Sequence, residues 1–443
     1  MATHADAVPL RRKVVRWNLF CNTADGAFAV LAFSLAHGTF VVAPFLRAIG
    51  ASDFIIGLIT GLVPLGTFLL PVLATGYIQS LPRKKPLVLK LGIFQRMHFP
   101  AVAVMALLML PAHPIAFLWL FALTSFITNA AGQGGLPAWL DMIAKTTPRD
   151  KRGLLFSMRN TLGVLPTFFA AGLIAWVLNN PSLPFPQNYS VIFGAAGLSF
   201  IISLLIIIGV RERGGKTKTG RSNPLQMLRD VPRVLRRDGE FGRYVASVGL
   251  NGIAMGMIGA FMALTAEDRF HVSAAEVTGQ YLAVTAACSI VGNLVFGRIG
   301  DRWGHRFNMV IRGPLFIVGC VIALLAQNPF QFGLAFIPIT LSGAVAGISQ
   351  MTMAMEFSSE RNRPRYTAIQ SMLSTPLMML GPLLGGFLRD YTSLSMSFFV
   401  AIALTAVSTY LQLTVRDPRQ RAVSRRLAAA ERAHHQHKDV EAV

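Results

Sequence analysis

The sequence contains few charged residues for its length. Only 14% of its 443 residues are Asp, Glu, Lys or Arg, whereas a soluble domain has roughly a quarter. Hydrophobic residues make up 53%, and they gather in runs of roughly 20 residues, each long enough to cross about 30 Å of hydrocarbon as a helix. The shortage of charge therefore excludes an ordinary soluble protein and predicts an all-α membrane protein.

Cysteines and catalytic motifs are also scarce. The three cysteines, Cys21, Cys288 and Cys320, all fall inside apolar runs, so they form no disulfide framework and no metal-binding spacing. The sequence has no Gly-x-x-x-x-Gly-Lys-Ser/Thr phosphate loop and no His-Glu-x-x-His motif. We therefore expect neither an enzyme nor an ATP-driven pump, and we expect no cofactor or bound metal.

Acidic residues are half as frequent as basic ones, which gives a net charge of +21. The bases lie in alternate loops, at 11–16, 83–85, 149–152, 211–243, 302–306, 361–365 and beyond 416. The intervening loops, at 110–114, 178–190 and 326–331, contain no Lys or Arg. This alternation follows the positive-inside rule. It predicts both termini in the cytoplasm, a plasma membrane of the bacterial inner-membrane type, and no nucleic-acid partner.

Twelve spans fit between the basic loops and turn residues. The predicted spans are 17–46, 52–80, 86–110, 114–144, 153–178, 189–210, 242–267, 274–299, 307–327, 330–357, 366–389 and 393–415. The predicted domains are an N-terminal segment (1–16), six spans (17–210), a basic linker (211–241), six further spans (242–415) and a tail (416–443). Within the linker we expect a short surface helix from Asn223, interrupted near Pro232.

A short basic turn is predicted at 297–306, where the sequence reads Gly-Arg-Ile-Gly-Asp-Arg-Trp-Gly-His-Arg. Its spacing, Gly-x-x-x-Asp-Arg-x-Gly-x-Arg, resembles the loop signature of the major facilitator superfamily. A degenerate copy at 76–85 keeps the first glycine and the last base but has Ser80 in place of the acid. The resemblance implies two six-helix bundles related by pseudo-two-fold symmetry, with a substrate site between them near the bilayer midplane.

The resemblance also implies a cytoplasmic gate made of charges at helix ends. The residues that match the family's gate are Gly297, Asp301, Arg302, Gly304, Arg306, Asp141, Arg152, Glu356 and Arg365. A simpler alternative is that these charges only set the topology. Because Ser80 lacks a carboxylate, we expect the gate to be asymmetric.

Asp25 is the only acid that we place well inside a span. It lies about eight residues, or roughly 12 Å, into the first span, on one helix face with Asn22. An ionisable group at this depth suggests a function, and we expect Asp25 to couple transport to protons or to recognise a cation. Arg96, roughly 15 Å into the third span, is a possible partner. The alternative is that Asp25 is ionised near the cytoplasmic end, paired with a base and purely structural.

Other polar residues on expected cavity helices complete a candidate binding site. They are Asn129 and Gln133 in the fourth span, Asn251 in the seventh and Gln350 in the tenth. Each of them, taken alone, is more often a hydrogen-bonding group between helices than a ligand contact.

The favoured function is secondary active transport of a small organic solute by alternating access, coupled to protons. The expected partners are a small-molecule substrate, the proton and the lipid bilayer, and we expect a monomer. The alternative is a transport-inactive membrane protein of the same fold that serves in binding or assembly.

Overall fold

The computed structural model describes residues 12–212, 214, 224–358 and 363–418. Within these ranges some side chains are not described, among them those of 64–76 and Arg152. Parts of the predicted N-terminal segment, linker and tail therefore lie outside the described residues.

Each predicted span corresponds to one helix or to consecutive helices. The first six contain α1 (Arg12–Leu35), η1 (Gly38–Val42), α2 (Ala43–Ala48), α3 (Asp53–Ser80), α4 (Lys85–Arg96), α5 (His98–Leu108), α6 (Pro114–Thr146), α7 (Arg149–Leu178) and α8 (Gln187–Ile208). The linker contains α9 (Pro224–Arg237). The last six contain α10 (Gly239–Gly259), α11 (Met262–Phe270), α12 (Ala274–Val277), η2 (Thr278–Leu282), α13 (Ala283–Trp303), α14 (His305–Leu325), α15 (Pro329–Leu334), α16 (Phe336–Glu356), α17 (Arg363–Tyr391) and α18 (Leu394–Leu413).

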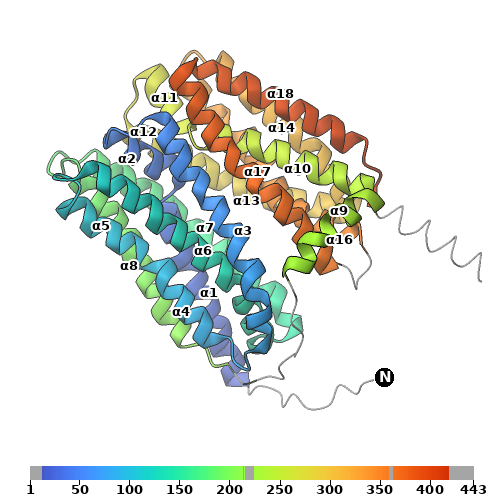
Figure 1. Cartoon of the computed structure of the whole chain (residues 1–443). Helices are drawn as coiled ribbons and strands as arrows, with labels where there is room; N and C mark the ends of the chain where they lie inside the picture. The colour runs from blue at the N-terminus through green and yellow to red at the C-terminus, as the bar shows by residue number, and fades with distance from the viewer. Residues whose placement is uncertain (1–11, 213, 215–223, 359–362, 419–443) are drawn as a thin grey trace, which may run out of the picture. The chain divides into compact units, whose positions relative to one another are not determined.

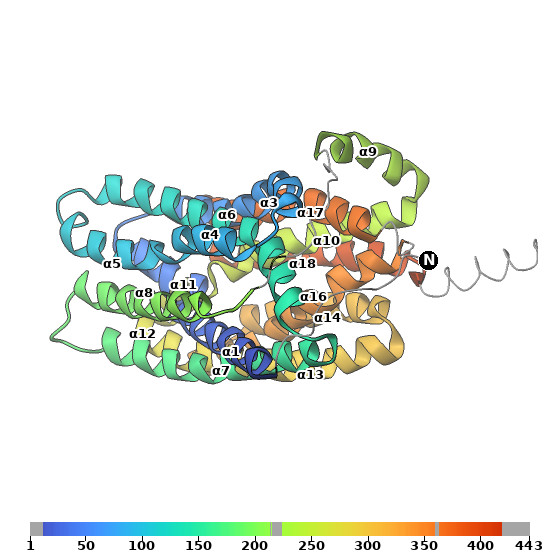
Figure 2. The same cartoon turned by 90° about the horizontal axis from the view of Figure 1, so that it is seen from below.

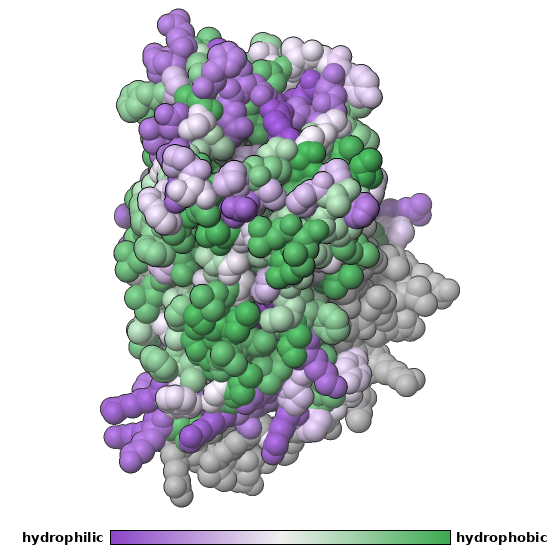
Figure 3. All heavy atoms as spheres, turned by 90° about the vertical axis from the view of Figure 1, so that its left-hand side faces the viewer, coloured by the Kyte–Doolittle hydropathy of each residue, from purple (hydrophilic) through white to green (hydrophobic). Residues whose placement is uncertain are grey.

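Ten helical runs among the described residues are long and apolar enough to cross a membrane. The prediction of an all-helical protein with many membrane spans is confirmed. On the face of the molecule drawn in Figure 3, apolar side chains form a belt between two polar ends. Apolar side chains that would be unusual on a soluble surface, such as Leu108 and Leu198, are well exposed, as expected for residues that face lipid.

Local sequence explains several helix starts. The side chains of Ser52 and Asn328 accept hydrogen bonds from backbone N–H groups three residues later, at 3.3 and 2.9 Å. Pro114 stands at the first position of α6, where its missing N–H costs nothing and its fixed φ suits a helix. Polar caps and prolines thus end the loops that separate the spans.

Two local predictions are wrong. The stretch 297–306 is not a turn, because α13 continues to Trp303 and α14 begins at His305. Gly304 alone breaks the helix, with φ of 90°, a conformation that costs glycine little because it has no Cβ. Helix α9 runs through Pro232 without interruption, although an interior proline removes one helix hydrogen bond and its ring crowds the preceding turn.

The described chain forms two compact units. Unit 1 contains residues 1–224, 259–286 and 382–392, and unit 2 contains 225–258, 287–381 and 393–443. In unit 1, α1 packs on α7 and α8, α4 packs on α6, and α5 packs on α8. In Figure 1, α4, α5, α6 and α8 form one group of helices. The view from below in Figure 2 shows α8, α1 and α7 next to one another.

Unit 1 joins segments that lie far apart in the sequence. An added Cβ at Gly57 of α3 would lie 2.2 Å from the carbonyl oxygen of Pro382, and one at Gly386 would lie 2.2 Å from that of Asp53. Only glycine allows backbones to approach this closely. The start of α3 and the end of α17 are therefore packed against each other inside unit 1.

Unit 2 has its own core. Helix α14 packs on α16 and α18. Phe241, Tyr244 and Phe357 form an aromatic cluster with ring centroids 5.3 to 6.2 Å apart, distances at which aromatic pairs are favourable. Val231 and Val234 of α9 pack against this core, so the linker helix uses its apolar face to dock on unit 2.

Candidate functional site

The carboxylate of Asp25 lies at the centre of a buried polar cluster in unit 1. Its Oδ1 accepts hydrogen bonds from Arg96 Nη2 at 3.1 Å and from Ser203 Oγ at 2.6 Å. Its Oδ2 accepts one from Arg159 Nη1 at 2.9 Å. Helices α1, α4, α7 and α8 each contribute one of these residues. The predicted pairing of Asp25 with Arg96 is present in the structure.

Two glycines make room for the arginines. A Cβ at Gly26 would lie 2.2 Å from Cγ of Arg159, and one at Gly92 would lie 2.7 Å from Nη1 of Arg96. A real Cβ could not lie this close to these atoms, so a larger residue at either position would displace the arginine. Each glycine therefore lets a guanidinium reach the carboxylate. The sequence thus builds the cluster with small residues beside large charged ones.

The two arginines differ in their access to solvent. The Arg96 side chain is 8% exposed and also donates to Ser203, whereas the Arg159 side chain is 18% exposed. Arg159 stacks on the ring of Trp139, with its guanidinium carbon 4.7 Å from the ring centroid. Arg96 is therefore the fixed partner of Asp25, and Arg159 is the partner on the open side of the cluster.

A cavity of about 270 Å³ opens onto this cluster. Asp25, Arg96 and Arg159 line it together with Gln95 and Trp139. The cavity therefore combines one carboxylate, two guanidiniums and an aromatic face, groups that can orient a small amphipathic molecule. The protonation of Asp25 would remove the negative charge that both guanidiniums contact.

The other predicted site residues of unit 1 do not bring their side chains to the carboxylate, although the backbone carbonyl of Asn22 accepts a hydrogen bond from Arg159 Nη1 at 2.7 Å. Asn22 is fully buried, but its side chain donates to the carbonyl oxygen of Asn18 in its own helix, at 2.8 Å. Asn129 likewise donates to Ser125 in its own helix, at 2.9 Å. Neither Asn129 nor Gln133 lines the cavity described above. For Asn22 and Asn129 the hydrogen-bonding alternative fits better than ligand contact.

In unit 2, Asn251 accepts a hydrogen bond from Nε of Arg312 at 2.6 Å, and a second from Nη2. Arg312 is 2% exposed, and its Nη1 has no hydrogen-bond partner among the described residues. The side chain of Gln350 is half-buried, and its backbone carbonyl accepts from the Tyr244 hydroxyl. The predicted Asn251 thus belongs to a buried pair of its own.

Sequence reasoning missed Arg159 and Arg312. Each lies only five or six residues inside a predicted span, so each looks like a topology charge at a helix end. The rule that treats any intramembrane arginine as a functional candidate would have found both. The sequence pattern does not show that the Arg159 side chain passes Gly26 to reach Asp25.

The predicted gate residues lie at helix ends. Asp301 and Arg302 are exposed near the end of α13, and Gly297 lies inside that helix. Gly304 forms the break, and Arg306 donates to the backbone carbonyls of Val415 and Leu413, at 2.6 and 3.1 Å. Arg306 therefore ties α14 to the end of α18.

The remaining gate residues also stand at helix ends. Asp141 lies 3.0 Å from Lys145 and 3.8 Å from Lys84. Burial lowers the pKa of the Lys84 ammonium, which also donates to the carbonyl of Leu81 at 2.5 Å. Glu356 closes α16, and Arg365 lies in the first turn of α17, with both residues partly buried. The side chain of Arg152 lies outside the described residues.

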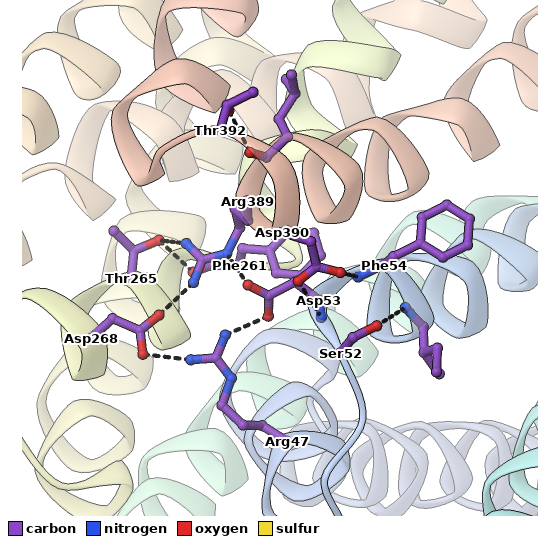
Figure 4. Close-up of polar contacts among 12 residues, drawn as sticks. Arg47, Ser52, Asp53, Phe54, Phe261, Thr265, Asp268, Arg389, Asp390 and Thr392 are labelled. Carbon is purple, nitrogen blue, oxygen red and sulfur yellow. Dashed lines mark hydrogen bonds and ion pairs between the residues drawn. The ribbon is translucent and has the colours of Figure 1, made fainter.

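A second polar network lies in unit 1, around Arg389 (Figure 4). Arg389 donates to Asp53 at 2.9 Å, to Thr265 at 2.7 Å and to Asp268 at 2.6 Å. Arg47 bridges the same two acids, with Nη1 2.5 Å from Asp268. The network thus joins the end of α2 and the start of α3 to α11 and to the end of α17.

Asp390, next to Arg389, caps the start of α3. Its carboxylate accepts hydrogen bonds from the backbone N–H of Asp53 at 3.1 Å and of Phe54 at 2.8 Å. A carboxylate at a helix N-terminus is stabilised by the exposed N–H groups and the helix dipole. Because the cap comes from α17 rather than from α3 itself, it adds to the attachment of these two segments.

A sequence model described as the Major Facilitator Superfamily matches residues 26–355 and 245–438. The chain is 25% identical over 407 residues to a multi-drug resistance efflux pump PmrA homolog of Lactococcus lactis, which covers 86% of this chain and 91% of that protein. It is 28% identical to an uncharacterized MFS-type transporter of Mycobacterium tuberculosis over 191 residues, 40% of this chain and only 26% of that protein.

The fold resembles that of a D-xylose-proton symporter. The TM-score is 0.71 at 11% sequence identity, with 91% of this chain and 99% of that chain covered. At this identity the likeness concerns the fold alone.

The buried cluster predicts the stability of one variant. Asp25→Asn leaves the buried guanidinium of Arg96 and the partly exposed guanidinium of Arg159 without a carboxylate, so we expect it to lower the free energy of unfolding by about 3 kcal/mol. SDS titration in mixed micelles measures this change. Asp141→Asn, which removes an acid whose side chain is 42% exposed, should change it by about 0–1 kcal/mol. Equal effects of the two variants would contradict the pairing.

The Arg389 network gives a second prediction. Arg389→Gln should lower the free energy of unfolding by about 3 kcal/mol or more, because Asp53 and Asp268 lose the more buried of the two arginines that they share. Arg389→Lys should recover little of this free energy of unfolding, because an ammonium cannot make the forked contacts of a guanidinium. The same titration tests both variants. Arg298→Gln, at an exposed base of α13, is the control, and a loss there as large as at Arg389 would refute the prediction.

Proposed function

The chain belongs to the Major Facilitator Superfamily, and we propose that it exports small amphipathic organic molecules, with transport coupled to protons through Asp25. It is a transporter-family protein and not an enzyme. The single observation that carries the proposal is the buried carboxylate of Asp25, which two arginines contact beside a cavity.

Asp25 suits proton coupling because its charge state controls its contacts. The ionised carboxylate accepts hydrogen bonds from Arg96, Arg159 and Ser203. A proton on Asp25 leaves a neutral acid, which holds a guanidinium much less strongly than a carboxylate does. Arg159, the more exposed partner, is then released toward the cavity. We propose that this release links proton binding to substrate binding.

The class of substrate follows from the cavity and from the relatives. Trp139 offers an aromatic face, and Leu136 adds apolar surface, beside the charged groups. A molecule with an apolar body and a polar or anionic group satisfies both parts. The Lactococcus lactis relative is named as a multi-drug resistance efflux pump, and its match along most of the chain supports export rather than uptake.

The remaining parts of the proposal follow the predicted topology. The bundles 17–210 and 242–415 would alternate between two states around a central site. The protein would be a monomer in the plasma membrane, with both termini in the cytoplasm. The Arg389 network joins segments from both predicted bundles. It would therefore have to break whenever that end of the protein opens.

The alternative is a protein that keeps the fold but has lost transport and serves in binding or assembly. Its support is the missing acid at Ser80, whose hydroxyl donates to the carbonyl of Tyr77 in its own helix. Solute flux decides between the two functions, because a protein that only binds gives no flux in proteoliposomes.

The main test measures proton-driven flux in proteoliposomes loaded with a fluorescent amphipathic solute. In the native protein, we expect an imposed pH gradient to drive transport. Asp25→Asn should abolish the dependence on the gradient, because Asn cannot take up a proton. Asp25→Glu keeps the carboxylate and should retain part of the coupling. Full gradient-driven flux in Asp25→Asn would refute the role of Asp25.

A glycine pair tests the part played by Arg159. Gly26→Ala places a methyl group where the Arg159 stem now lies, so we expect it to displace Arg159 and to impair coupling while Asp25 remains. In α7, Gly172→Ala meets nothing within 4 Å and is the matched control. Normal coupling in Gly26→Ala would show that Arg159 is dispensable.

The predicted gate gives a further test. Asp301→Asn should slow the conformational cycle, because it removes the acid of the family signature, whereas Ser80→Ala should have little effect. The measurement is the rate of substrate exchange across proteoliposomes with both variants at equal density. Equal rates in the two variants would contradict the expected asymmetry.

A further inference from the structure

Unit 1 contains a second pocket, separate from the cavity at Asp25. Its volume is about 780 Å³. It lies where α1 and α4 begin and α8 ends, next to the loop before α4 (Figure 1). Trp17, Arg83, Lys85 and Arg211 are among the residues that line it. On the topology predicted from the basic loops, this is the cytoplasmic edge of the membrane.

Hydrogen bonds between distant segments fix the walls of this pocket. Trp17 donates through Nε1 to the carbonyl of Gly209 at 2.9 Å. The Asn18 side chain exchanges two hydrogen bonds with the backbone of Arg211, at 3.1 and 2.8 Å. Lys85 Nζ donates to the carbonyl of Ile208 at 2.6 Å. The start of α1 and the start of α4 thus both hold the end of α8 in place.

The single acid of the pocket is already engaged. The Glu212 carboxylate accepts hydrogen bonds from the backbone N–H groups of Lys84 at 2.9 Å and Lys85 at 2.7 Å. Its side chain is 1% exposed, and Lys145 Nζ lies 3.8 Å away. Glu212 therefore serves the N-terminus of α4 and does not neutralise the open part of the pocket.

The bases at the pocket mouth remain available. Arg83 and Arg211 are exposed, and within the described part of the chain neither guanidinium has a carboxylate partner. With Lys85 they give three positive charges against the one negative charge of Glu212. The pocket therefore has a net charge of +2 at a membrane edge, where it favours an anion that can accept hydrogen bonds from guanidiniums.

Apolar side chains continue from the pocket toward the bilayer. One helical turn deeper, Phe20 follows Trp17, Ile93 follows Leu89 and Leu205 precedes Ile208. Phe20, Ile93 and Leu205 are 61%, 48% and 62% exposed. Basic groups at the mouth and exposed apolar groups one turn deeper match the two parts of a phospholipid. A tryptophan at their boundary is typical of a membrane interface.

We propose that this pocket binds the headgroup of an anionic glycerophospholipid, with Arg83 and Arg211 on the phosphate and the acyl chains along Phe20, Ile93 and Leu205. The inference does not depend on the transport function proposed above. Free inorganic phosphate shares the charge chemistry but not the apolar part, so the test must distinguish the two.

The test uses the purified full chain in neutral detergent, with dioleoyl phosphatidylglycerol, dioleoyl phosphatidylcholine or inorganic phosphate as the probe. Native mass spectrometry measures the affinity for the tightest lipid. We expect phosphatidylglycerol to bind more tightly than phosphatidylcholine, and Arg83→Gln/Arg211→Gln to weaken it about tenfold or more. Lys90→Gln/Arg298→Gln removes the same charge at exposed sites outside the pocket and should leave the affinity unchanged.

Quenching of Trp17 fluorescence by dibrominated phosphatidylglycerol locates the lipid. The quenching should fall in Trp17→Phe and in the Arg83→Gln/Arg211→Gln variant, and an unchanged unfolding temperature of the latter in phosphatidylcholine would confirm its fold. Equal binding of the two lipids, or normal lipid binding by the double variant, would overturn the proposal. Full competition by millimolar inorganic phosphate would assign the site to free phosphate instead.

Discussion

A carboxylate inside a membrane protein must be paired, and Asp25 shows how strongly this constraint shapes the helices around it. Its two guanidinium partners and one hydroxyl come from α4, α7 and α8. Three helices must therefore stand at fixed distances from α1. Gly26 and Gly92 keep those distances short enough for Arg159 and Arg96 to reach. The burial of one charge thus sets the packing of four helices.

The Asp25 cluster and the Arg389 network use the same chemistry with different access to solvent. Each of the three guanidinium nitrogens of Arg389 donates a hydrogen bond, to Asp53, Thr265 and Asp268, and the Arg389 side chain is 1% exposed. Arg159 donates to Asp25 at 2.9 Å and to the backbone carbonyl of Asn22 at 2.7 Å, and it lies at an open cavity. A buried network with two acids favours rigid attachment, whereas a charge with solvent nearby can exchange a partner at lower cost.

The sequence predicted the helices well because hydrophobic length and loop charge are local properties. It also offered Arg96 as a possible partner of Asp25, since both are charged and both lie deep in their spans, but it left open that Arg96 reaches the interface instead. It failed at Gly297–Arg306, where the family signature suggested a loop and only Gly304 interrupts the helices. The contact of Arg159 with Asp25 depends on the rotation of α7 about its axis, which no short motif encodes.

The buried arginines of the two units differ in the partner that each one contacts. Arg96 and Arg312 lie in the third and ninth spans, and each contacts a polar residue of the first span of its half, Asp25 or Asn251. The amide in unit 2 cannot carry charge, so Arg312 has no acid there whose protonation could change its contacts. If both halves descend from one repeat, proton exchange is a property of the acid at Asp25 and not of the buried arginine. Unit 1 would then supply the proton coupling, and the Asn251–Arg312 pair of unit 2 would have only a structural role.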